Sequence, residues 1–146
     1  MASFEQLDDL YKEIILDHYR NPRNRRSIES PDAAWEGANP LCGDEVAIQL
    51  SINGDSIEDI AFQGQGCAIS QASSSMLTDS LKGKRIDEAK ALAIAFKEMM
   101  QGKDAVDFDE YGDLEALTGV MQFPVRVKCA TLAWNVLEQT LKEYEA

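Results

Sequence analysis

Three cysteines, Cys42, Cys67 and Cys129, are the residues of this chain whose type and position are best suited to chemistry. Cys42 lies in a turn-rich stretch, Cys67 ends a glycine-punctuated run, and Cys129 follows shortly after Pro124. An odd number of thiols cannot pair fully in disulfides within one chain. Together with the carboxylate of Asp44, three thiols would complete a four-coordinate metal site. The alternative is that all three are free cysteines acting as small buried hydrophobic side chains, because cysteine is among the most buried residue types.

The three cysteines are far apart in the sequence, so only the tertiary fold can bring them together. There is no Cys-x₂-Cys pair, which argues against a zinc finger or ribbon. The first two cysteines have 24 residues between them and the last two have 61. Gly43 and Gly66 adjoin Cys42 and Cys67 and allow unusual backbone conformations there. We expect the loops that carry the three thiols to lie at one end of a sheet.

Two of the cysteines are predicted to lie near helix starts. Cys67 comes where a strand gives way to a helix, and Cys129 comes near the first turns of the last helix. Unpaired N–H groups and the helix dipole favour a thiolate at such positions. The sequence therefore predicts lowered pKa values for both thiols.

The composition is typical of a globular protein in water. Of the 146 residues, 45% are hydrophobic and 27% are charged, enough for one domain over residues 1–146 with its own core. We see no signal peptide and no apolar run near the roughly 20 residues that span a bilayer. We therefore expect a cytoplasmic protein with reduced thiols and no membrane partner. The net charge of −12 argues against nucleic acid as the main partner.

Alternating apolar residues predict the strands that position Cys42 and Cys67. A period of two runs from Val46 to Ile52, Asn53-Gly54 interrupts it, and a second apolar strand follows from Ile57 to Phe62. This pattern indicates a β-hairpin with one buried face. A shorter strand over residues 34–38 is expected to pair with the hairpin.

Helical spacing of apolar residues accounts for most of the remaining sequence. The first helix is expected from Phe4 to Arg20, with Ser3 and Gln6 as a capping box. Asp87 is expected to cap a later helix. Helices are predicted over residues 4–20, 67–81 and 87–102, briefly from 113, and from 124 to the C-terminus. The fold class is then α+β, with a small antiparallel sheet of about three strands and helices packed on one face.

Each cysteine lies in a distinctive block of sequence. The blocks are Asn39-Pro40-Leu41-Cys42-Gly43-Asp44, residues 62–74 from Phe62 to Ser74, and Val125-Arg126-Val127-Lys128-Cys129. They resemble the three cysteine blocks of the SufU/IscU family, whose members are similar to the NifU N-terminal domain. Proteins of this family are scaffolds and sulfur acceptors in iron–sulfur cluster assembly. The resemblance covers nearly the whole chain, including a first helix that ends in Tyr19-Arg20-Asn21-Pro22.

Within that family the chain resembles the SufU branch. The IscU branch typically has a histidine before the third cysteine, where this chain has Lys128. The IscU branch also carries a chaperone-binding Leu-Pro-Pro-Val-Lys element, where this chain has Phe123-Pro124-Val125-Arg126. Residues 83–112 resemble the extra segment that SufU-type proteins have between the second and third cysteines.

The resemblance implies a zinc-dependent sulfurtransferase of iron–sulfur cluster assembly. In that interpretation Cys42, Asp44, Cys67 and Cys129 bind Zn²⁺, and Cys42 accepts persulfide sulfur from a SufS-type cysteine desulfurase that carries pyridoxal phosphate. A cluster-assembly scaffold would be the downstream partner. The alternative is that this chain is itself a scaffold on which a [2Fe–2S] cluster is assembled and transferred. Both functions use the same ligands, and Lys128 in place of histidine favours zinc.

Other charged residues have less specific interpretations. Arg126 precedes Cys129 by three residues, so it shares a helix face with that thiol. It is predicted to bind an acidic partner or to steady the negative charge of the site, and the alternative is a simple surface arginine. His18, the only histidine, lies on the apolar stripe of the first helix and is predicted to be packed there. Four arginines within residues 20–26 indicate either a solvated loop or a docking site. The acidic segment 104–113 lacks EF-hand spacing and is predicted to be solvated.

Overall fold

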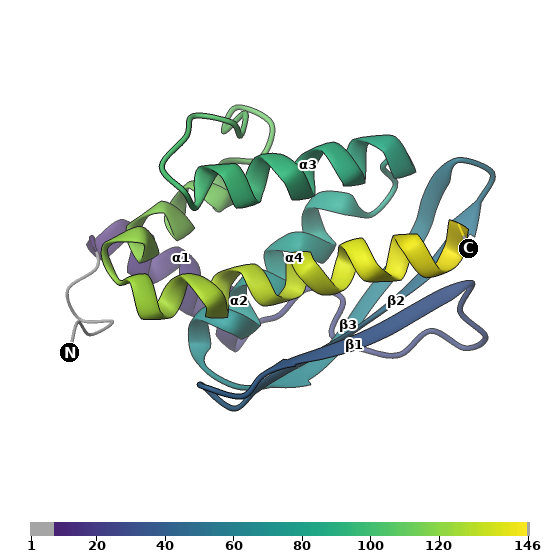
Figure 1. Cartoon of the computed structure of the whole chain (residues 1–146), viewed down its shortest axis with the longest axis horizontal. Coiled ribbons are helices and arrows are strands. Elements are labelled where there is room, and N and C mark those ends of the chain that lie inside the picture. Colours follow the sequence, from purple (N-terminus) through teal and green to yellow (C-terminus); the bar gives the residue numbers. More distant parts are fainter. Residues whose placement is uncertain (1–7, 146) are drawn as a thin grey trace.

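The computed structural model describes residues 8–145 and contains a three-stranded sheet, four α-helices and a long 3₁₀ helix in that range (Figure 1). Its elements are α1 (Asp9–Arg20), β1 (Ala33–Asn39), β2 (Asp44–Asn53), β3 (Ser56–Gln65), α2 (Ala68–Leu81), α3 (Ile86–Met99), the 3₁₀ helix η2 (Gly112–Gln122) and α4 (Pro124–Glu145). The capping box expected at Ser3 and Gln6 lies outside the described residues. α1 begins at Asp9, and the side chain of Asp8 accepts the Leu10 N–H at 2.9 Å.

The sheet is antiparallel, with strand order β1-β2-β3. The hairpin predicted from the period of two is present, and its strands are joined at Asn53 and Ser56 through Gly54, which has a φ of +63°. Val46, Ile48 and Leu50 of β2 are buried, and the residues between them are more exposed. This alternation gives the sheet one face toward the core. The predicted α+β class is confirmed.

Helices cover the buried face of the sheet. α4 contacts β1 and β2, and α2 contacts β3. α3 packs on α4 on the side away from the sheet, and α1 packs against α2 and η2 (Figure 1). None of the helices within residues 8–145 combines the length and apolar character needed to cross a membrane.

Buried serines on α2 tie it to its neighbours. Ser73 Oγ donates to the Ala130 carbonyl at 2.6 Å and accepts the Trp134 Nε1–H at 3.1 Å, so one hydroxyl links α2 to two residues of α4. Trp134 also stacks on Phe96 of α3, with ring centroids 4.4 Å apart. The layers of the fold are therefore joined by specific polar and aromatic contacts as well as by aliphatic packing.

His18 is packed, as its place on the apolar stripe of α1 predicted. Its side chain is completely buried, with Nδ1 2.8 Å from Ser75 Oγ of α2 and Nε2 2.7 Å from Asp113 Oδ2 of η2. A carboxylate only accepts, so Nε2 carries the proton of that contact. Ser75 Oγ also accepts the Arg23 N–H, which leaves its own proton free for Nδ1. His18 thus connects three elements.

The structure differs from the sequence-based expectation in two helices. Asp87 was expected to cap α3, but that prediction is wrong. The N-cap is Arg85, whose N–H donates to the Glu88 carboxylate, and Asp87 lies in the first turn. The short helix expected from Asp113 is an 11-residue 3₁₀ helix. Its buried residues include Leu114, Leu117 and Val120, whose spacing of three suits a helix with three residues per turn.

Candidate metal centre

The segments that carry the three cysteines meet at one end of the sheet. Asn39, the last residue of β1, pairs with Asp44, the first residue of β2, so Cys42 lies in the turn between them. Glu45 pairs with Gln65, the last residue of β3, and α2 starts three residues later with Cys67 as its N-cap. α4, which carries Cys129, crosses the sheet from the same end (Figure 1).

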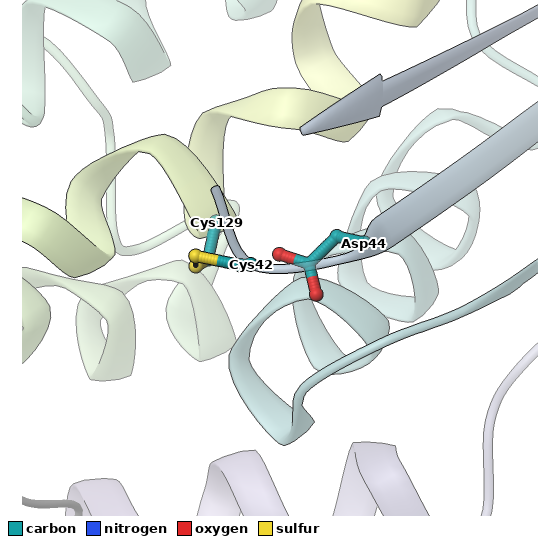
Figure 2. Close-up of side chains that lie close together, drawn as sticks. All are labelled: Cys42, Asp44 and Cys129. Atoms are coloured by element: carbon teal, nitrogen blue, oxygen red, sulfur yellow. Dashed lines mark hydrogen bonds between the residues drawn. The ribbon is translucent and has the colours of Figure 1, made fainter. Parts of the chain in front are cut away.

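Three of the four predicted ligands form a compact group. The ligand atoms of Cys42, Asp44 and Cys129 all lie within 4.8 Å of one another. The two sulfurs are 3.2 Å apart, which is too far for a disulfide, and the Asp44 carboxylate points toward them (Figure 2). Cys129 and Asp44 are completely buried, whereas Cys42 is partly exposed.

The fourth predicted ligand, Cys67, lies outside this group but interacts with both Asp44 and Cys129. Its sulfur is 3.8 Å from Asp44 Oδ2, and its backbone N–H donates to Asp44 Oδ1 at 2.9 Å. The sulfur also accepts the Ser70 N–H at 3.4 Å, as the cap of α2. Asp44 therefore contacts Cys67 through both the backbone N–H and the sulfur of that residue.

Asn39 shapes the turn that carries Cys42, a role that sequence reasoning did not assign. Its carbonyl accepts the Cys42 N–H at 3.2 Å, and its side-chain Oδ1 accepts the Leu41 N–H at 3.2 Å. Gly43 follows with a φ of +69°, a conformation that favours glycine. The sequence signal was available, because asparagine before proline is a frequent turn start.

The absence of a side chain at Gly66 leaves room for the Asp44 carboxylate. A Cβ atom on Gly66 would lie 2.2 Å from Asp44 Oδ1, and the φ of Gly66 is +145°. Any side chain here would therefore both strain the backbone and displace the carboxylate. The glycine-punctuated run before Cys67 was the sequence signal for this close approach.

Cys67 and Cys129 do not have the lowered pKa values that their predicted positions near helix starts suggested. Burial raises the pKa of Cys67; the Ser70 N–H offsets this in part, and the Asp44 charge adds to it. Burial also raises the pKa of Cys129, reinforced by its contact with Cys42 and by the negative charges of Cys67 and Asp44. The expectation is wrong because desolvation outweighs the helix dipole. Cys129 is moreover the sixth residue of α4, beyond its first turn.

Arg126 is the cation that faces the thiols. Hydrogen bonding to Cys129, together with the negative charges of Cys67, Cys129 and Cys42, raises its pKa. Arg126 also lines an apolar cavity of about 520 Å³ that opens beside Cys42, with Leu41, Phe123, Pro124 and Val125 among the other lining residues. Leu41 and Val125 are 76% and 67% exposed, so the rim of this cavity is unusually apolar for a surface.

The donor set suits a soft or borderline divalent cation. Thiolates and a carboxylate are typical ligands of Zn²⁺ in four-coordinate sites, at bond lengths near 2.3 Å and 2.0–2.2 Å. Two sulfurs on one tetrahedral zinc are about 3.8 Å apart by that geometry, so the sulfurs of Cys42 and Cys129, which are 3.2 Å apart, would move slightly apart around the ion. A cation would also compensate the buried carboxylate and would favour the thiolate forms that burial otherwise opposes. The residues therefore fit a zinc ion, and the same soft ligands suit an iron–sulfur cluster.

Comparisons with known proteins identify similar chains. The family model described as the NifU-like N terminal domain matches residues 10–130. The chain is 45% identical to the zinc-dependent sulfurtransferase SufU of Bacillus subtilis, over 99% of this chain and 98% of that protein. It is 44% identical to the iron–sulfur cluster assembly scaffold protein IscU of Streptococcus pyogenes, over 96% of this chain and 87% of that protein.

A solved structure has the same fold. It is a putative iron–sulfur cluster assembly scaffold protein for the SUF system from Fervidobacterium islandicum, with a TM-score of 0.83 and 37% identity. The match covers 88% of this chain and 94% of that one. Most of this chain therefore shares its fold with a protein named for cluster assembly.

Proposed function

The chain belongs to the NifU-like N-terminal domain family, and from that premise we propose that it is a zinc-dependent sulfurtransferase of iron–sulfur cluster assembly. In this proposal Cys42 accepts sulfur from a SufS-type cysteine desulfurase that bears pyridoxal phosphate, and a cluster-assembly scaffold is the next acceptor. The reaction takes place in the cytoplasm, where thiols stay reduced. The grouping of Cys42, Asp44 and Cys129 within 4.8 Å is the observation that carries the proposal.

Zinc is proposed to be held by Cys42, Asp44, Cys67 and Cys129. When bound there, it keeps its ligand thiols deprotonated at neutral pH. Asp44 supplies the oxygen ligand and also accepts the Cys67 N–H, so the carboxylate orients a second ligand. The guanidinium of Arg126 balances part of the negative charge of the thiolates.

Cys42 is the thiol best placed to receive sulfur. It is partly exposed and lies in a turn, whereas Cys129 is completely buried in α4. Its thiolate attacks the terminal sulfur of the partner's cysteine persulfide, forming a sulfur–sulfur bond to Cys42. The partner's own sulfur–sulfur bond breaks and its electron pair leaves with the partner thiolate. A thiolate enters and a thiolate leaves, so the step needs no external oxidant or reductant.

The cavity beside Cys42 supports approach by another protein. Leu41 and Val125 form its exposed apolar rim, and Cys42 and Arg126 line the same cavity. Contiguous exposed apolar surface is one mark of a protein interaction site. Arg126 is proposed to contact the partner there in addition to its role beside the thiols.

The second candidate function is a scaffold for a [2Fe–2S] cluster. It is favoured by the 44% identity to a protein named as a scaffold and by ligands that suit either metal. Against it, Lys128 beside Cys129 is an exposed lysine, which is not a cluster ligand in proteins.

Persulfide transfer with a purified cysteine desulfurase and cysteine tests the proposal. Mass spectrometry should find one added sulfur on Cys42 of protein that holds about one zinc per chain and has no visible chromophore. Cys42→Ser should take up no sulfur, whereas Lys128→Ala, an exposed change beside Cys129, should behave as the unaltered chain. Uptake by Cys42→Ser would refute the accepting role, and a visible iron–sulfur absorption with no zinc would favour the scaffold.

A further inference from the structure

A second cavity lies beside the metal centre, between the end of α1 and the turn from β3 into α2. Its volume is about 390 Å³, and Tyr19, Pro22, Arg25, Gln65, Gly66 and Gln71 line it. Gly66 is also in close contact with Asp44, so the cavity adjoins the candidate ligands without including any of them. No acidic side chain is among the described residues that line it.

Arg25 brings an uncompensated positive charge to this cavity. Of the four arginines in residues 20–26, Arg23 pairs with Asp17 at 2.8 Å and Arg26 pairs with Asp59 at 2.6 Å. Within residues 8–145, Arg20 and Arg25 have no acidic partner. Arg25 Nη2 donates to the Gly64 carbonyl at 3.0 Å, which holds the guanidinium beside the cavity and leaves its charge unpaired.

Gln71 adds a buried donor that lacks an acceptor. This residue is only 6% exposed, and its Nε2 has no hydrogen-bond partner in the described part of the chain. Buried polar groups without partners are rare in folded proteins, and each one calls for an explanation. The Nε2 atom itself has almost no accessible surface, so a ligand oxygen in the cavity that Gln71 lines would supply the missing acceptor after the side chain turns toward it.

The other polar groups of the cavity favour the same kind of ligand. The Tyr19 hydroxyl has no protein partner among residues 8–145 and is available as a donor. Gln65 already donates its Nε2–H to Glu45 Oε2 at 2.8 Å, so that N–H is used, and Glu45 itself is not a lining residue. A guanidinium, an amide N–H and a phenol O–H all donate, and together they call for an anionic acceptor.

We propose that this cavity is a binding site for a carboxylate group. A carboxylate matches the planar fork of the Arg25 guanidinium and carries the single charge that one unpaired arginine balances. On a chain of net charge −12, a multiply charged anion would be repelled more strongly. The volume lies at the small end of ligand pockets, which run from roughly 300 to 1,000 Å³. It suits a short carboxylic acid or the side chain of an aspartate or glutamate.

Titration with a capped glutamate, followed by NMR of the ¹⁵N-labelled protein, tests this site. N-acetyl-L-glutamate α-methylamide carries the side-chain carboxylate as its sole charge, and the corresponding glutamine derivative is its neutral control. The glutamate derivative should give saturable shifts of the Gln71 side-chain amide and of the Arg25 Nε–H. The glutamine derivative should not shift them.

Two matched variants make the test specific. Arg25→Gln should weaken binding of the glutamate derivative by at least tenfold, whereas Arg20→Gln removes the other unpaired arginine, which does not line the cavity, and should leave binding unchanged. Absence of saturable shifts in the unaltered chain, equal binding of the glutamine derivative, or equal losses in the two variants would each overturn the proposal.

The affinity of each variant for the cysteine desulfurase distinguishes the source of the carboxylate. Weaker desulfurase binding by Arg25→Gln, with Arg20→Gln unchanged, identifies a carboxylate that belongs to the docked protein. Unchanged desulfurase binding, with the glutamate titration retained in the unaltered chain, identifies a free carboxylate. Zinc content is measured in parallel and should be the same in both variants, so failure of the carboxylate site is separable from failure of the zinc proposal.

Discussion

Asp44 combines two tasks that ordinarily fall to separate residues. It is completely buried within reach of two thiols, and it accepts the backbone N–H of the residue that carries the third. A buried carboxylate needs compensation by hydrogen bonds and opposite charge. The single N–H from Cys67 supplies part of this, and a cation between the thiols would supply the rest.

Asp44→Asn separates the charge of this residue from its hydrogen bond. The amide oxygen can still accept the Cys67 N–H, so the fold should persist, whereas the affinity for zinc should fall by at least about tenfold, the loss typical of altering a metal's surroundings. Metal analysis after dialysis against a zinc buffer, with circular dichroism for the fold, measures both. Glu45→Gln, an exposed change at the next position, is the control. Full zinc retention by Asp44→Asn would exclude the carboxylate as a ligand.

Gly66→Ala tests the close approach behind Asp44. The added Cβ would lie 2.2 Å from Asp44 Oδ1 at a φ of +145°, so we expect a loss of about 1–3 kcal/mol in unfolding free energy, together with weaker zinc binding. Gly83→Ala has a comparable positive φ of +83° but meets no atom within 4 Å, so it reports backbone strain alone. Urea unfolding of both variants gives the difference. Equal costs would show that the Asp44 contact is unimportant.

At the scale of elements, α2 is unusual in burying a run of serines against α4 and α1. The Ser73 hydroxyl carries two hydrogen bonds to α4, whereas the Ser74 hydroxyl donates within its own helix to the Ser70 carbonyl at 3.0 Å. The N-cap of α2 is Cys67, so the docking of this helix also sets the position of a candidate ligand.

Ser73→Ala should therefore destabilise the chain more than Ser74→Ala. The first change leaves the buried Trp134 Nε1–H without an acceptor, which costs about 1–3 kcal/mol. Ser74→Ala removes only a hydrogen bond to the Ser70 carbonyl, which still accepts a backbone N–H of the helix. Its cost should be under about 1 kcal/mol. Chemical denaturation at neutral pH compares the two. The reverse order would show that α2 and α4 are held together mainly by apolar packing.

The segment between α1 and β1 is held to the sheet by a salt bridge. Arg26 pairs with Asp59 of β3 in a two-pronged contact, with Oδ1 and Oδ2 accepting at 2.6 and 2.9 Å. Hydrogen bonding to Arg26 lowers the pKa of Asp59 below its ordinary value of 3.8, with Lys82 contributing to the same effect. This contact accounts for one of the four clustered arginines as a structural residue.

The lowered pKa of Asp59 gives the salt bridge a defined pH dependence. Its stabilisation is fully present above pH 3.8, the ordinary value, and is lost as the pH falls from there through the lower value in the folded chain. Because both side chains are partly exposed, the contribution is about 0.2–1 kcal/mol. Asp59→Asn should thus be less stable than the unaltered chain at pH 7, and the difference should vanish near pH 2. A difference that stays constant with pH would assign the effect to packing.

Particular residues show why sequence reasoning succeeded for the strands and failed for details of the helices. The alternation of Val46, Ile48 and Leu50 has one interpretation, a half-buried strand, so the hairpin was predictable. Asp87 is a good capping residue in isolation, but Ile86 N–H already bonds the Asp55 carbonyl and the helix starts at that contact. Similarly, Cys67 does lie at a helix start, but burial reverses the expected direction of its pKa. Tertiary contacts decided both cases.

At the scale of the whole molecule, the candidate centre joins parts of the chain that sequence spacing leaves unconnected. Cys42 comes from the turn between β1 and β2, Asp44 from the first position of β2, Cys67 from the cap of α2, and Cys129 from α4. The sheet provides the shared end at which these segments meet. The donor types could be read from the sequence, but the separation of 3.2 Å between Cys42 and Cys129 depends on how α4 packs across β1 and β2.

Removal of the metal should therefore lower global stability as well as activity. An ion bound by ligands from three segments stabilises the folded chain over the unfolded one, by about 4 kcal/mol when free zinc is 1,000-fold above its dissociation constant. For a chain of this size that corresponds to a fall of about 10 °C in the unfolding midpoint on chelation. Differential scanning calorimetry before and after chelation measures it. Added zinc should restore the midpoint and magnesium should not, because thiolates select the softer ion. The midpoint of Asp44→Asn should respond less to the chelator than that of the unaltered chain. If chelation does not change the midpoint of the unaltered chain, these segments are held together without a bound ion.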